Sequence, residues 1–211
     1  FYGGNGIVGA HIQVATGVGL KIKTRHENGV VLCFFGDGAI HQGSFHESLN
    51  MAKIWNLPVL YICENNQYGM GTDFRRVSAV TDFTILGNSY GIKGRLVNGM
   101  DVLQVYEIVS EEVARIRKEH SPGFIEIKTY RYKGHSMSDP ARYRTRDELE
   151  AYRLQDPILL LKTRMLEEHL FTEELYLELD SKIKRICDES VKFAEKSNDP
   201  PLDSIYEDVE V

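Results

Sequence analysis

The sequence has few cysteines, no excess of positive charge and no apolar run that approaches the length of a membrane span. Its three cysteines, Cys33, Cys63 and Cys187, form no Cys-x-x-Cys pair. A disulfide framework and a structural zinc site are therefore not indicated. The net charge of −6 gives no support for general nucleic-acid binding. With 42% apolar and 27% charged residues, the composition is that of a soluble globular domain, with neither nucleic acid nor membrane as a partner.

Other signatures of chemistry are also missing or weak. His41 and His46 are five positions apart, which does not place both on one helix face as a metal pair. None of Ser44, Ser48 and Ser136 lies in a Gly-x-Ser-x-Gly elbow, so none of them indicates a hydrolase. The chain begins Phe-Tyr-Gly-Gly, with neither an initiator Met nor a signal-peptide pattern. We therefore expect it to start inside a longer protein.

What is present is a strand–helix–strand pattern at residues 30–71. Apolar runs at residues 30–35 and 59–63 are typical of buried parallel strands, and the apolar positions between them have helical spacing. Asp37 follows the first run, and Asn65 and Asn66 follow the second. Because the crossover between parallel strands is right-handed, the turns after both strands emerge at the same edge of the sheet. We therefore expect Asp37 and Asn66 to meet in space.

Carboxylate and amide oxygens at such an edge suit Mg²⁺ or Ca²⁺ better than a soft metal. Mg²⁺ usually bridges a protein carboxylate to the phosphates of a ligand. We expect Gly36 and Gly38 to let the backbone turn sharply and bring N–H groups near those phosphates. The following helix would point its N-terminus at the same place. The turn at residues 36–38 or the turn at residues 65–66, taken alone, is more simply explained as an ordinary turn. The two turns together predict a Mg²⁺–diphosphate cradle.

The rest of the pattern predicts an α/β domain at residues 1–145, with its N-terminal part missing, and a helical extension at residues 146–211 packed on it. Ala15, Gly17 and Gly19 indicate that the first helix packs closely on the sheet. The acidic segment 199–211 is expected to be extended or docked on a partner. Further strands are expected at residues 95–97 and 124–130, helices at 11–23, 45–55, 102–120 and beyond 147, and an irregular segment with one short helix at 72–92.

Several helix starts carry a capping signal. Ser44 with Glu47, and Asp101 with Gln104, match the capping-box spacing. The other two signals are a cap at Thr172 and the pair Asp156-Pro157, with proline in the first turn.

Two loops remain open to more than one interpretation. Residues 4–9 match Gly-x-Gly-x-x-Gly, which is either the nucleotide turn of a Rossmann oxidoreductase or a loop whose backbone approaches another ligand. Residues 131–146 hold five Arg or Lys residues and one acid, Asp139. This segment is either a solvated loop or a loop that faces an anion. His135, between Gly134 and Ser136, is its candidate for an anion contact.

Five stretches together resemble a known family: FYGGNGIVGA, GDGAIHQGSFHESLNMA, ENNQYGMGT, TYRYKGHSMSDP and YRTRDE. They are similar to the alpha subunits of the thiamine diphosphate-dependent 2-oxoacid dehydrogenases, from residue 1 to about residue 165. Gly-Asp-Gly at 36–38 followed by Asn-Asn at 65–66 resembles the thiamine diphosphate motif of that family. The sequences of residues 6–9 and 66–71 are more similar to the pyruvate branch of the family than to its branched-chain 2-oxoacid or acetoin branches.

The resemblance implies a doubly wound, mostly parallel sheet of the thiamine diphosphate-binding fold. It implies that Mg²⁺ is bound by the Asp37 carboxylate, the Asn66 side chain and the Tyr68 carbonyl. Arg131 would hold the loop that carries His135. The positions implied in cofactor binding are Gly36, Gly38 and Ala39 at the diphosphate, Gly6 and Val8 at the aminopyrimidine ring, and His135, which would also be catalytic, over the diphosphate.

The implied activity is oxidative decarboxylation of pyruvate, with transfer of the acetyl group to a lipoyl-bearing dihydrolipoyl acyltransferase. The carboxylate that acts at the pyrimidine ring comes from a beta subunit in this family, which implies an α2β2 heterotetramer. Ser136 matches a position that kinases phosphorylate in mitochondrial relatives, whereas Asp73 stands where those relatives carry a second target serine. Residues 140–144 lack a third target. This favours a cytoplasmic bacterial enzyme over one of the mitochondrial matrix. A non-catalytic scaffold with the same fold is a rival hypothesis.

Overall fold

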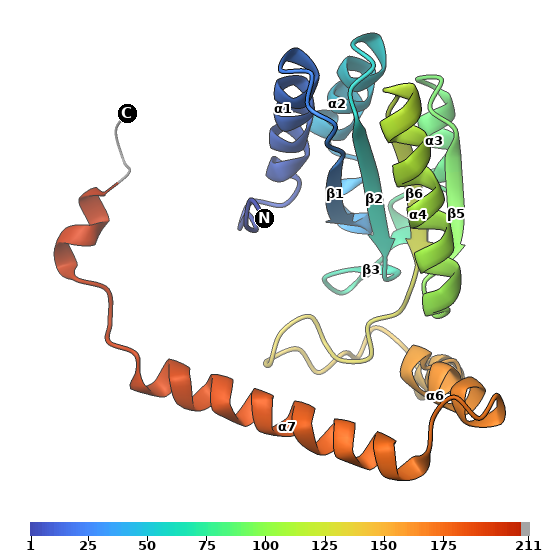
Figure 1. Cartoon of the computed structure of the whole chain (residues 1–211), viewed down its shortest axis with the longest axis vertical. Coiled ribbons are helices and arrows are strands. Elements are labelled where there is room, and N and C mark those ends of the chain that lie inside the picture. Colours follow the sequence, from blue (N-terminus) through green and yellow to red (C-terminus); the bar gives the residue numbers. More distant parts are fainter. Residues whose placement is uncertain (208–211) are drawn as a thin grey trace. The chain divides into compact units, whose positions relative to one another are not determined.

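The structure is a computed structural model that describes residues 1–207. The chain divides into two compact units, Phe1–Leu161 and Lys162–Val211. The first contains a sheet of four parallel strands, which confirms the α/β fold class and all four predicted strands (Figure 1). In spatial order the strands are β1 (Val31–Gly36), β2 (Val59–Asn65), β6 (Gly123–Lys128) and β5 (Gly94–Asn98).

Helices cover both faces of this sheet, as expected for a doubly wound fold (Figure 1). Because successive side chains of a strand point to opposite faces, Phe124 joins one core and Ile125 and Ile127 join the other. The Phe124 core is covered by α1 (Ala10–Thr24), α2 (Gly43–Ile54) and α3 (Thr84–Asn88), and the other core by α4 (Val102–Glu119). Cys33 and Cys63 are buried in the first core as small apolar side chains, as predicted.

Helix α1 approaches the sheet through small residues, although not through all three that the sequence suggested. A Cβ added at Gly19 would lie 2.5 Å from Cγ2 of Val59 on β2. Ala15 is buried in the same interface. Gly17, in contrast, is exposed, and a Cβ there would meet nothing within 4 Å. The close approach therefore depends on Gly19 and Ala15.

Two alanine substitutions in α1 are expected to change stability in opposite directions. Gly19→Ala should lower the free energy of unfolding by about 1–3 kcal/mol, because the added methyl group overpacks against Val59. Gly17→Ala should raise it by roughly 0.5–1 kcal/mol, because alanine has the better helix propensity and enough space. Urea unfolding of both variants measures the difference. Equal effects of the two substitutions would contradict the packing described here.

Two of the predicted caps are confirmed. The Asp101 carboxylate accepts from the N–H groups of Leu103 and Gln104, at 3.0 and 3.1 Å, at the start of α4. The Thr172 hydroxyl accepts from the N–H of Leu175, at 3.3 Å, at the start of α7 (Glu173–Lys196). Each cap satisfies backbone donors that have no partner within the helix.

The two capping boxes are wrong. Helix α2 begins at Gly43 and its N-cap is Gln42, so Ser44 lies inside the first turn. The short 3-10 helix η1 (Asp37–Ala39) precedes this start, and the N–H of Gln42 donates to the carbonyl group of Ala39. The position of η1 therefore makes Gln42, and not Ser44, the N-cap. At α4, the Gln104 side chain accepts from the N–H of Asn98, at 2.7 Å, and does not return to its own N-cap residue.

A hairpin that the sequence did not predict reaches with its second strand into the segment expected to be irregular, residues 72–92. Strands β3 (Tyr68–Gly69) and β4 (Thr72–Asp73) pair antiparallel, and the 3-10 helix η2 (Phe74–Arg76) follows. Met70 turns the chain in the left-handed region, with φ 54°. Strands of two residues are too short to show an alternating pattern, which is why the sequence did not reveal them. The expected short helix within residues 72–92 is α3.

The C-terminal region is helical, as predicted from residue 147 onward. It begins with α5 (Arg146–Arg153), which belongs to the first unit, and α6 (Pro157–Glu167), whose start is capped by the Asp156 carboxylate. In the second unit, Lys162 pairs with Glu173 at 2.9 Å and lies 3.8 Å from the centre of the Tyr176 ring. Packing of this unit on the first stays a prediction.

The acidic tail is not simply extended. The 3-10 helix η3 (Leu202–Tyr206) occupies part of segment 199–211, whose residues 208–211 lie outside the described part of the chain. Within residues 1–207, none of the helices combines the length and the apolar character that a bilayer crossing requires.

Candidate metal and diphosphate site

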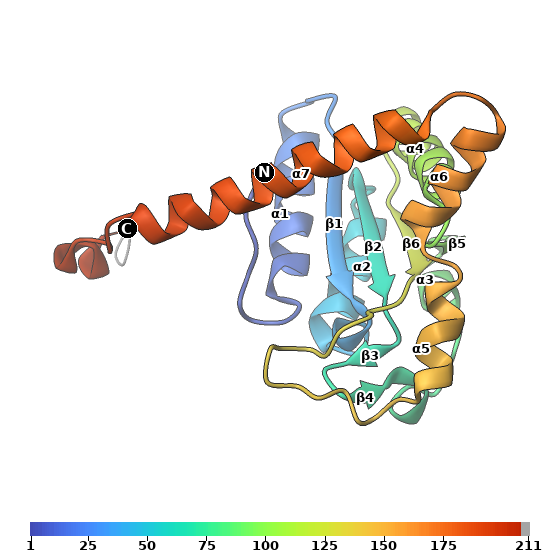
Figure 2. The ribbon, with the colours of Figure 1, turned by 90° about the horizontal axis from the view of Figure 1, so that it is seen from below.

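The turns that the sequence placed at one edge do lie together. Strands β1, β2 and β6 are parallel, so their carboxyl ends share an edge, where the β3–β4 hairpin and the loop after β6 also lie (Figure 2). A Cβ added at Gly38 would lie 3.8 Å from the Cα of Gly69, so the two backbones approach each other closely. The turn after β1 and the hairpin after β2 therefore form one surface.

Asp37 is the buried acid of this surface, with 5% of the residue exposed. Burial raises the pKa of its carboxyl group, and the negative charge of Asp73 acts in the same direction. Hydrogen bonds from the backbone N–H groups of Asp37 and Asn66, and the nearby positive charge of Arg131, lower this pKa. The hydrogen bond from Asn66 joins the two turns directly. The predicted meeting of Asp37 and Asn66 is therefore confirmed.

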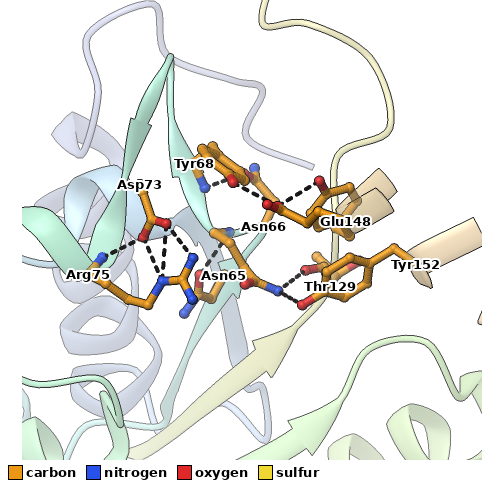
Figure 3. A network of polar contacts seen from close by, with 10 residues as sticks. Asn65, Asn66, Tyr68, Asp73, Arg75, Thr129, Glu148 and Tyr152 are labelled. Carbon is orange, nitrogen blue, oxygen red and sulfur yellow. Dashed lines mark hydrogen bonds and ion pairs between the residues drawn. The ribbon is translucent and has the colours of Figure 1, made fainter. Parts of the chain in front are cut away.

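Two further oxygens lie in the turn after β2. The Asn66 amide oxygen accepts from the N–H of Tyr68 at 3.1 Å (Figure 3). The Tyr68 carbonyl accepts from Arg131 Nη1 at 3.2 Å. Each of these oxygens has two lone pairs, so each retains one for another partner. Within residues 1–207, no three His, Cys, Asp or Glu side chains gather as a metal-binding cluster. A carboxylate, an amide oxygen and a carbonyl are the hard ligands that Mg²⁺ accepts beside phosphate oxygens.

The glycines beside Asp37 act differently from the sequence-based expectation. Gly36 has φ −83° and ψ 166°, an extended conformation open to any residue. The glycines with positive φ in residues 1–207 are Gly3, Gly9 and Gly91, so Gly38 is not among them either. A Cβ added at Gly36 would meet nothing within 4 Å. The glycine at this position therefore leaves open space beside the carboxylate and does not create a sharp turn.

The Gly-x-Gly-x-x-Gly segment ends as the N-cap of α1. Gly9 has φ 80°, and a Cβ there would collide with the side-chain amide of Gln42. The segment therefore lies beside the turn that follows Ala39, which is itself buried. Gly6 and Val8 are exposed, and their contacts with a cofactor ring stay a prediction.

A carboxylate that the sequence analysis did not identify stabilises the turn after β2. Glu148 of α5 accepts from the hydroxyl groups of Tyr68 and Tyr130, at 2.7 and 2.8 Å (Figure 3). The Tyr130 ring stacks on Tyr152, with centroids 3.9 Å apart and planes 8° from parallel. Gln67 in turn donates to the Tyr152 hydroxyl. Helix α5 is thus tied to Gln67 and Tyr68, the two residues that follow Asn66, and to Tyr130 after β6.

Arg131 holds the loop that follows β6, as the resemblance implied. Its guanidinium donates to the carbonyl groups of Tyr68 and Met70 and to the Tyr143 hydroxyl, the last at 2.8 Å. The same loop is closed by Arg144, which donates to the carbonyl groups of Arg131 and Tyr132. Arg131 and Arg144, two of the five basic residues, thus hold backbone carbonyl groups, which neither of the two interpretations of this loop anticipated.

His135 lies on the exposed part of this loop. Its backbone N–H donates to the Asp139 carboxylate at 2.7 Å, and this bond is the main cause that lowers the pKa of Asp139. The Tyr143 hydroxyl donates to the same carboxylate at 2.8 Å. Within residues 1–207 the imidazole of His135 has no hydrogen-bond partner, and Ser136 is exposed with its hydroxyl 3.1 Å from that of Ser138. The loop backbone is fixed while the His135 ring is free to meet a ligand.

The tyrosines bound to Glu148 should titrate late. Burial and Glu148 raise the pKa of Tyr130 to about 12 and that of Tyr68 further, while Arg144 opposes the shift at Tyr130. An unfolded tyrosine has a pKa of about 10. Between these values the unfolded chain loses protons that the folded chain keeps, so the free energy of unfolding should fall as pH rises through this window.

Ultraviolet titration of tyrosinate measures this shift. Tyr130→Phe should remove a late-titrating group from the curve, and the matched control Tyr106→Phe, at a residue 74% exposed, should leave that group in place. Identical titration curves for the two variants would show that Tyr130 is not shielded as described.

A Gly-x-Ser-x-Gly pattern at residues 87–91 is not a nucleophile elbow. Ser89 follows the last residue of α3. An elbow instead places its serine between a strand and the helix that follows it. The pattern therefore gives no support for a hydrolase.

Comparison with known proteins points in one direction. The family model described as dehydrogenase E1 component matches residues 1–203. The pyruvate dehydrogenase E1 component subunit alpha of Rhizobium meliloti is 44% identical over 210 residues, covering 99% of this chain and 60% of that protein. The subunit of the same name in Rickettsia bellii is 42% identical over 211 residues, covering 100% of this chain and 65% of that protein.

A mitochondrial relative is similarly close. The mitochondrial pyruvate dehydrogenase E1 component subunit alpha of Sminthopsis macroura is 44% identical over 207 residues, covering 97% of this chain and 56% of that protein. The chain thus spans between 56% and 65% of the length of these three relatives.

Proposed function

Because the chain belongs to the family of dehydrogenase E1 components, we propose that it is the alpha subunit of a pyruvate dehydrogenase (acetyl-transferring), an oxidoreductase that requires thiamine diphosphate and Mg²⁺. The reaction is oxidative decarboxylation of pyruvate, with transfer of the acetyl group to the lipoyl group of a dihydrolipoyl acyltransferase. The observation that carries this proposal is the buried Asp37 carboxylate, hydrogen-bonded to the Asn66 turn beside the Tyr68 carbonyl. That set of oxygens suits Mg²⁺ bound to a diphosphate.

The residues of this chain bind and orient the cofactor. Thiamine diphosphate, when bound, supplies the electron sink that makes loss of carbon dioxide from a 2-oxo acid possible. Asp37, Asn66 and the Tyr68 carbonyl would hold Mg²⁺, and His135 would contact the diphosphate from its loop. The remaining cofactor contacts would be made by Gly36, Gly38 and Ala39 at the diphosphate and by Gly6 and Val8 at the pyrimidine ring.

A beta subunit completes the active site in an α2β2 heterotetramer. Exposed apolar side chains on the edge strand of the sheet support a larger assembly: Leu32 and Phe34 of β1 are 42% and 49% exposed. Parallel sheets are normally covered on both faces. A groove of about 480 Å³ beside these residues contains His11, whose Nδ1 atom is buried without a hydrogen-bond partner within residues 1–207. The alpha chain therefore leaves a surface that another part of the assembly can cover.

The similarity to alpha subunits of pyruvate dehydrogenase favours pyruvate over branched-chain 2-oxo acids and acetoin. The bacterial relatives support a cytoplasmic location in a bacterium, and the mitochondrial relatives support the matrix as the alternative. Ser136 is exposed and accessible to a kinase. Asp73, at the position of a second target serine, instead binds Arg75 in the hairpin, which favours an enzyme without kinase control.

Co-expression of the full-length protein with its beta partner tests the function. We expect decarboxylation that requires both thiamine diphosphate and Mg²⁺ and that has its highest kcat/KM with pyruvate among pyruvate, branched-chain 2-oxo acids and acetoin. A preference for one of the other substrates would show that the enzyme belongs to the branch of the family that acts on that substrate. Tight NADH binding without any dependence on Mg²⁺ would instead support the Rossmann oxidoreductase. Folded protein with neither activity would support the non-catalytic scaffold.

A further inference from the structure

A buried carboxylate in the centre of the sheet has no place in the function described so far. Glu126 lies on β6, between β2 and β5, and is 0% exposed. Its two oxygens accept only from neutral N–H groups: Oε1 from the Asn65 side chain and Oε2 from the backbone of Phe83, both at 2.8 Å. Burial raises the pKa of this carboxyl group. Burying an acid without a paired cation is costly, so the position requires an explanation.

The two hydrogen bonds belong to a directed chain. The backbone N–H of Gln67 donates to Asn65 Oδ1 at 2.9 Å, and Asn65 Nδ2 donates to Glu126. The other oxygen of Glu126 accepts from the N–H of Phe83. Both ends of this hydrogen-bond chain are backbone N–H groups, which can only donate. Asn65 accepts at one end and donates at the other, so the group at position 126 must accept twice.

A carboxylate meets this requirement, and a glutamine does not. The amide of a glutamine at position 126 would bring a hydrogen atom to one of its two contacts. A donor would then face another donor, at either Asn65 or Phe83. Rotating the Asn65 amide by half a turn does not help, because its NH₂ group would then face the N–H of Gln67. The pair of facing donors then lies at Gln67 and Asn65 instead of at Glu126, but it is not removed.

The chain of hydrogen bonds ends in the turn that carries the proposed metal ligands. Asn65 is the residue before Asn66, and its side chain binds the N–H of the residue before Tyr68 (Figure 3). The backbone carbonyl of Asn65 also accepts from the N–H of Thr129, at 2.9 Å, which fixes the end of β2 against β6. The orientation of the Asn65 side chain therefore helps to set where Asn66 and Tyr68 point.

We propose that Glu126 is a positioning residue, which fixes the direction of this hydrogen-bond chain and thereby holds the Asn66–Tyr68 turn in the shape that binds Mg²⁺. The inference rests on the proposed function, because its predicted effect is on metal-dependent cofactor binding. Partners that orient metal ligands typically change metal affinity by roughly 10–100-fold when they are removed. Glu126→Gln should therefore raise the Kd for Mg²⁺ by about that factor, with kcat at saturating metal changed by less than about threefold.

Exchanging the two side-chain types provides the sharpest test. Asn65→Asp alone would set two carboxylates against each other, and Glu126→Gln alone would set two donors against each other. In the double variant Asn65→Asp/Glu126→Gln, the carboxylate at position 65 accepts twice. The amide at position 126 then donates to it and accepts from Phe83. The direction of the chain is restored with the same net charge, so Mg²⁺ affinity should recover by at least about tenfold relative to Glu126→Gln.

The variants are compared as full-length protein with the beta subunit, by calorimetric titration of Mg²⁺ at a fixed concentration of thiamine diphosphate and by thermal unfolding. The matched control is Glu112→Gln, because Glu112 is 7% exposed but is paired with Arg95 on β5 and Arg115 on α4. This control should lower thermal stability without changing Mg²⁺ affinity.

Mg²⁺ affinity in Glu126→Gln equal to that of the wild type would overturn the inference. So would a double variant that binds Mg²⁺ no better than Glu126→Gln. If Glu126→Gln does not fold, the double variant should still fold, and its failure to do so would also count against the proposal. A wild-type protein that shows no Mg²⁺-dependent cofactor binding would instead overturn the proposed function, a result that needs no variant to detect.

Discussion

Replacing Asp37 with alanine is expected to abolish Mg²⁺-dependent binding of thiamine diphosphate while leaving the protein folded. Asp37 is the carboxylate of the proposed ligand set, and the other two ligands are uncharged oxygens of Asn66 and Tyr68. At an effective dielectric constant of about 20, two unit charges about 4 Å apart attract by roughly 4 kcal/mol. Loss of this attraction weakens binding on the order of a thousandfold.

Folding and binding should separate clearly in this variant. Burial raises the pKa of the Asp37 carboxyl group, so its ionised form is disfavoured by the folded state. Removing it also leaves the N–H of Asn66 without its acceptor, so the free energy of unfolding should fall by no more than about 1–3 kcal/mol. The matched control is Asp73→Asn, which removes a neighbouring acid but no proposed ligand and should retain cofactor binding. Calorimetry and urea unfolding measure the two quantities. Normal Mg²⁺-dependent binding in Asp37→Ala would show that the cradle is assigned wrongly.

The second large effect is expected from Arg131→Met. This substitution removes the guanidinium that links the loop after β6 to the carbonyl groups of Tyr68 and Met70 and to the Tyr143 hydroxyl. Each hydrogen bond to a charged group contributes about 1.5–3 kcal/mol, so losing them should release the loop that carries His135. We expect kcat/KM for the 2-oxo acid to fall on the order of a hundredfold.

Arg142→Met is the matched control for this effect. It removes the same charge from the same loop, but Arg142 is exposed and makes none of these bonds. Its kcat/KM should change by less than about threefold. Limited proteolysis provides a second measurement, since residues 131–145 should be cleaved faster in Arg131→Met than in Arg142→Met. Similar kinetics and cleavage in both variants would refute the role of Arg131 in holding the loop.

Features with a regular pattern could be predicted from the sequence. Continuous apolar runs indicated β1 and β2, and parallel topology then required Asp37 and Asn66 to share an edge. The capping box at Ser44 failed because its spacing is a local signal, whereas the start of α2 is set by the preceding 3-10 helix. Local patterns predicted elements well and their exact ends poorly.

The supporting contacts of the site could not be predicted in the same way. Glu148 meets Tyr68 from 80 positions away, and no periodicity relates the two. Glu126 did stand out in the sequence, as an acid between two isoleucines of its strand, but its partner Asn65 is 61 positions distant. The direction of that hydrogen-bond chain depends on which backbone groups face it. Only the folded arrangement supplies this information.

The proposed Mg²⁺–diphosphate cradle at Asp37 can be tested on the wild-type chain co-expressed with the proposed beta subunit. The protein is titrated with thiamine diphosphate, once with Mg²⁺ and once with the metal removed by a chelator. We expect saturable binding with Mg²⁺, at least about a hundredfold weaker binding without it, and recovery when Mg²⁺ is restored. Equally tight binding in the two titrations, or none in either, would contradict the proposed cradle.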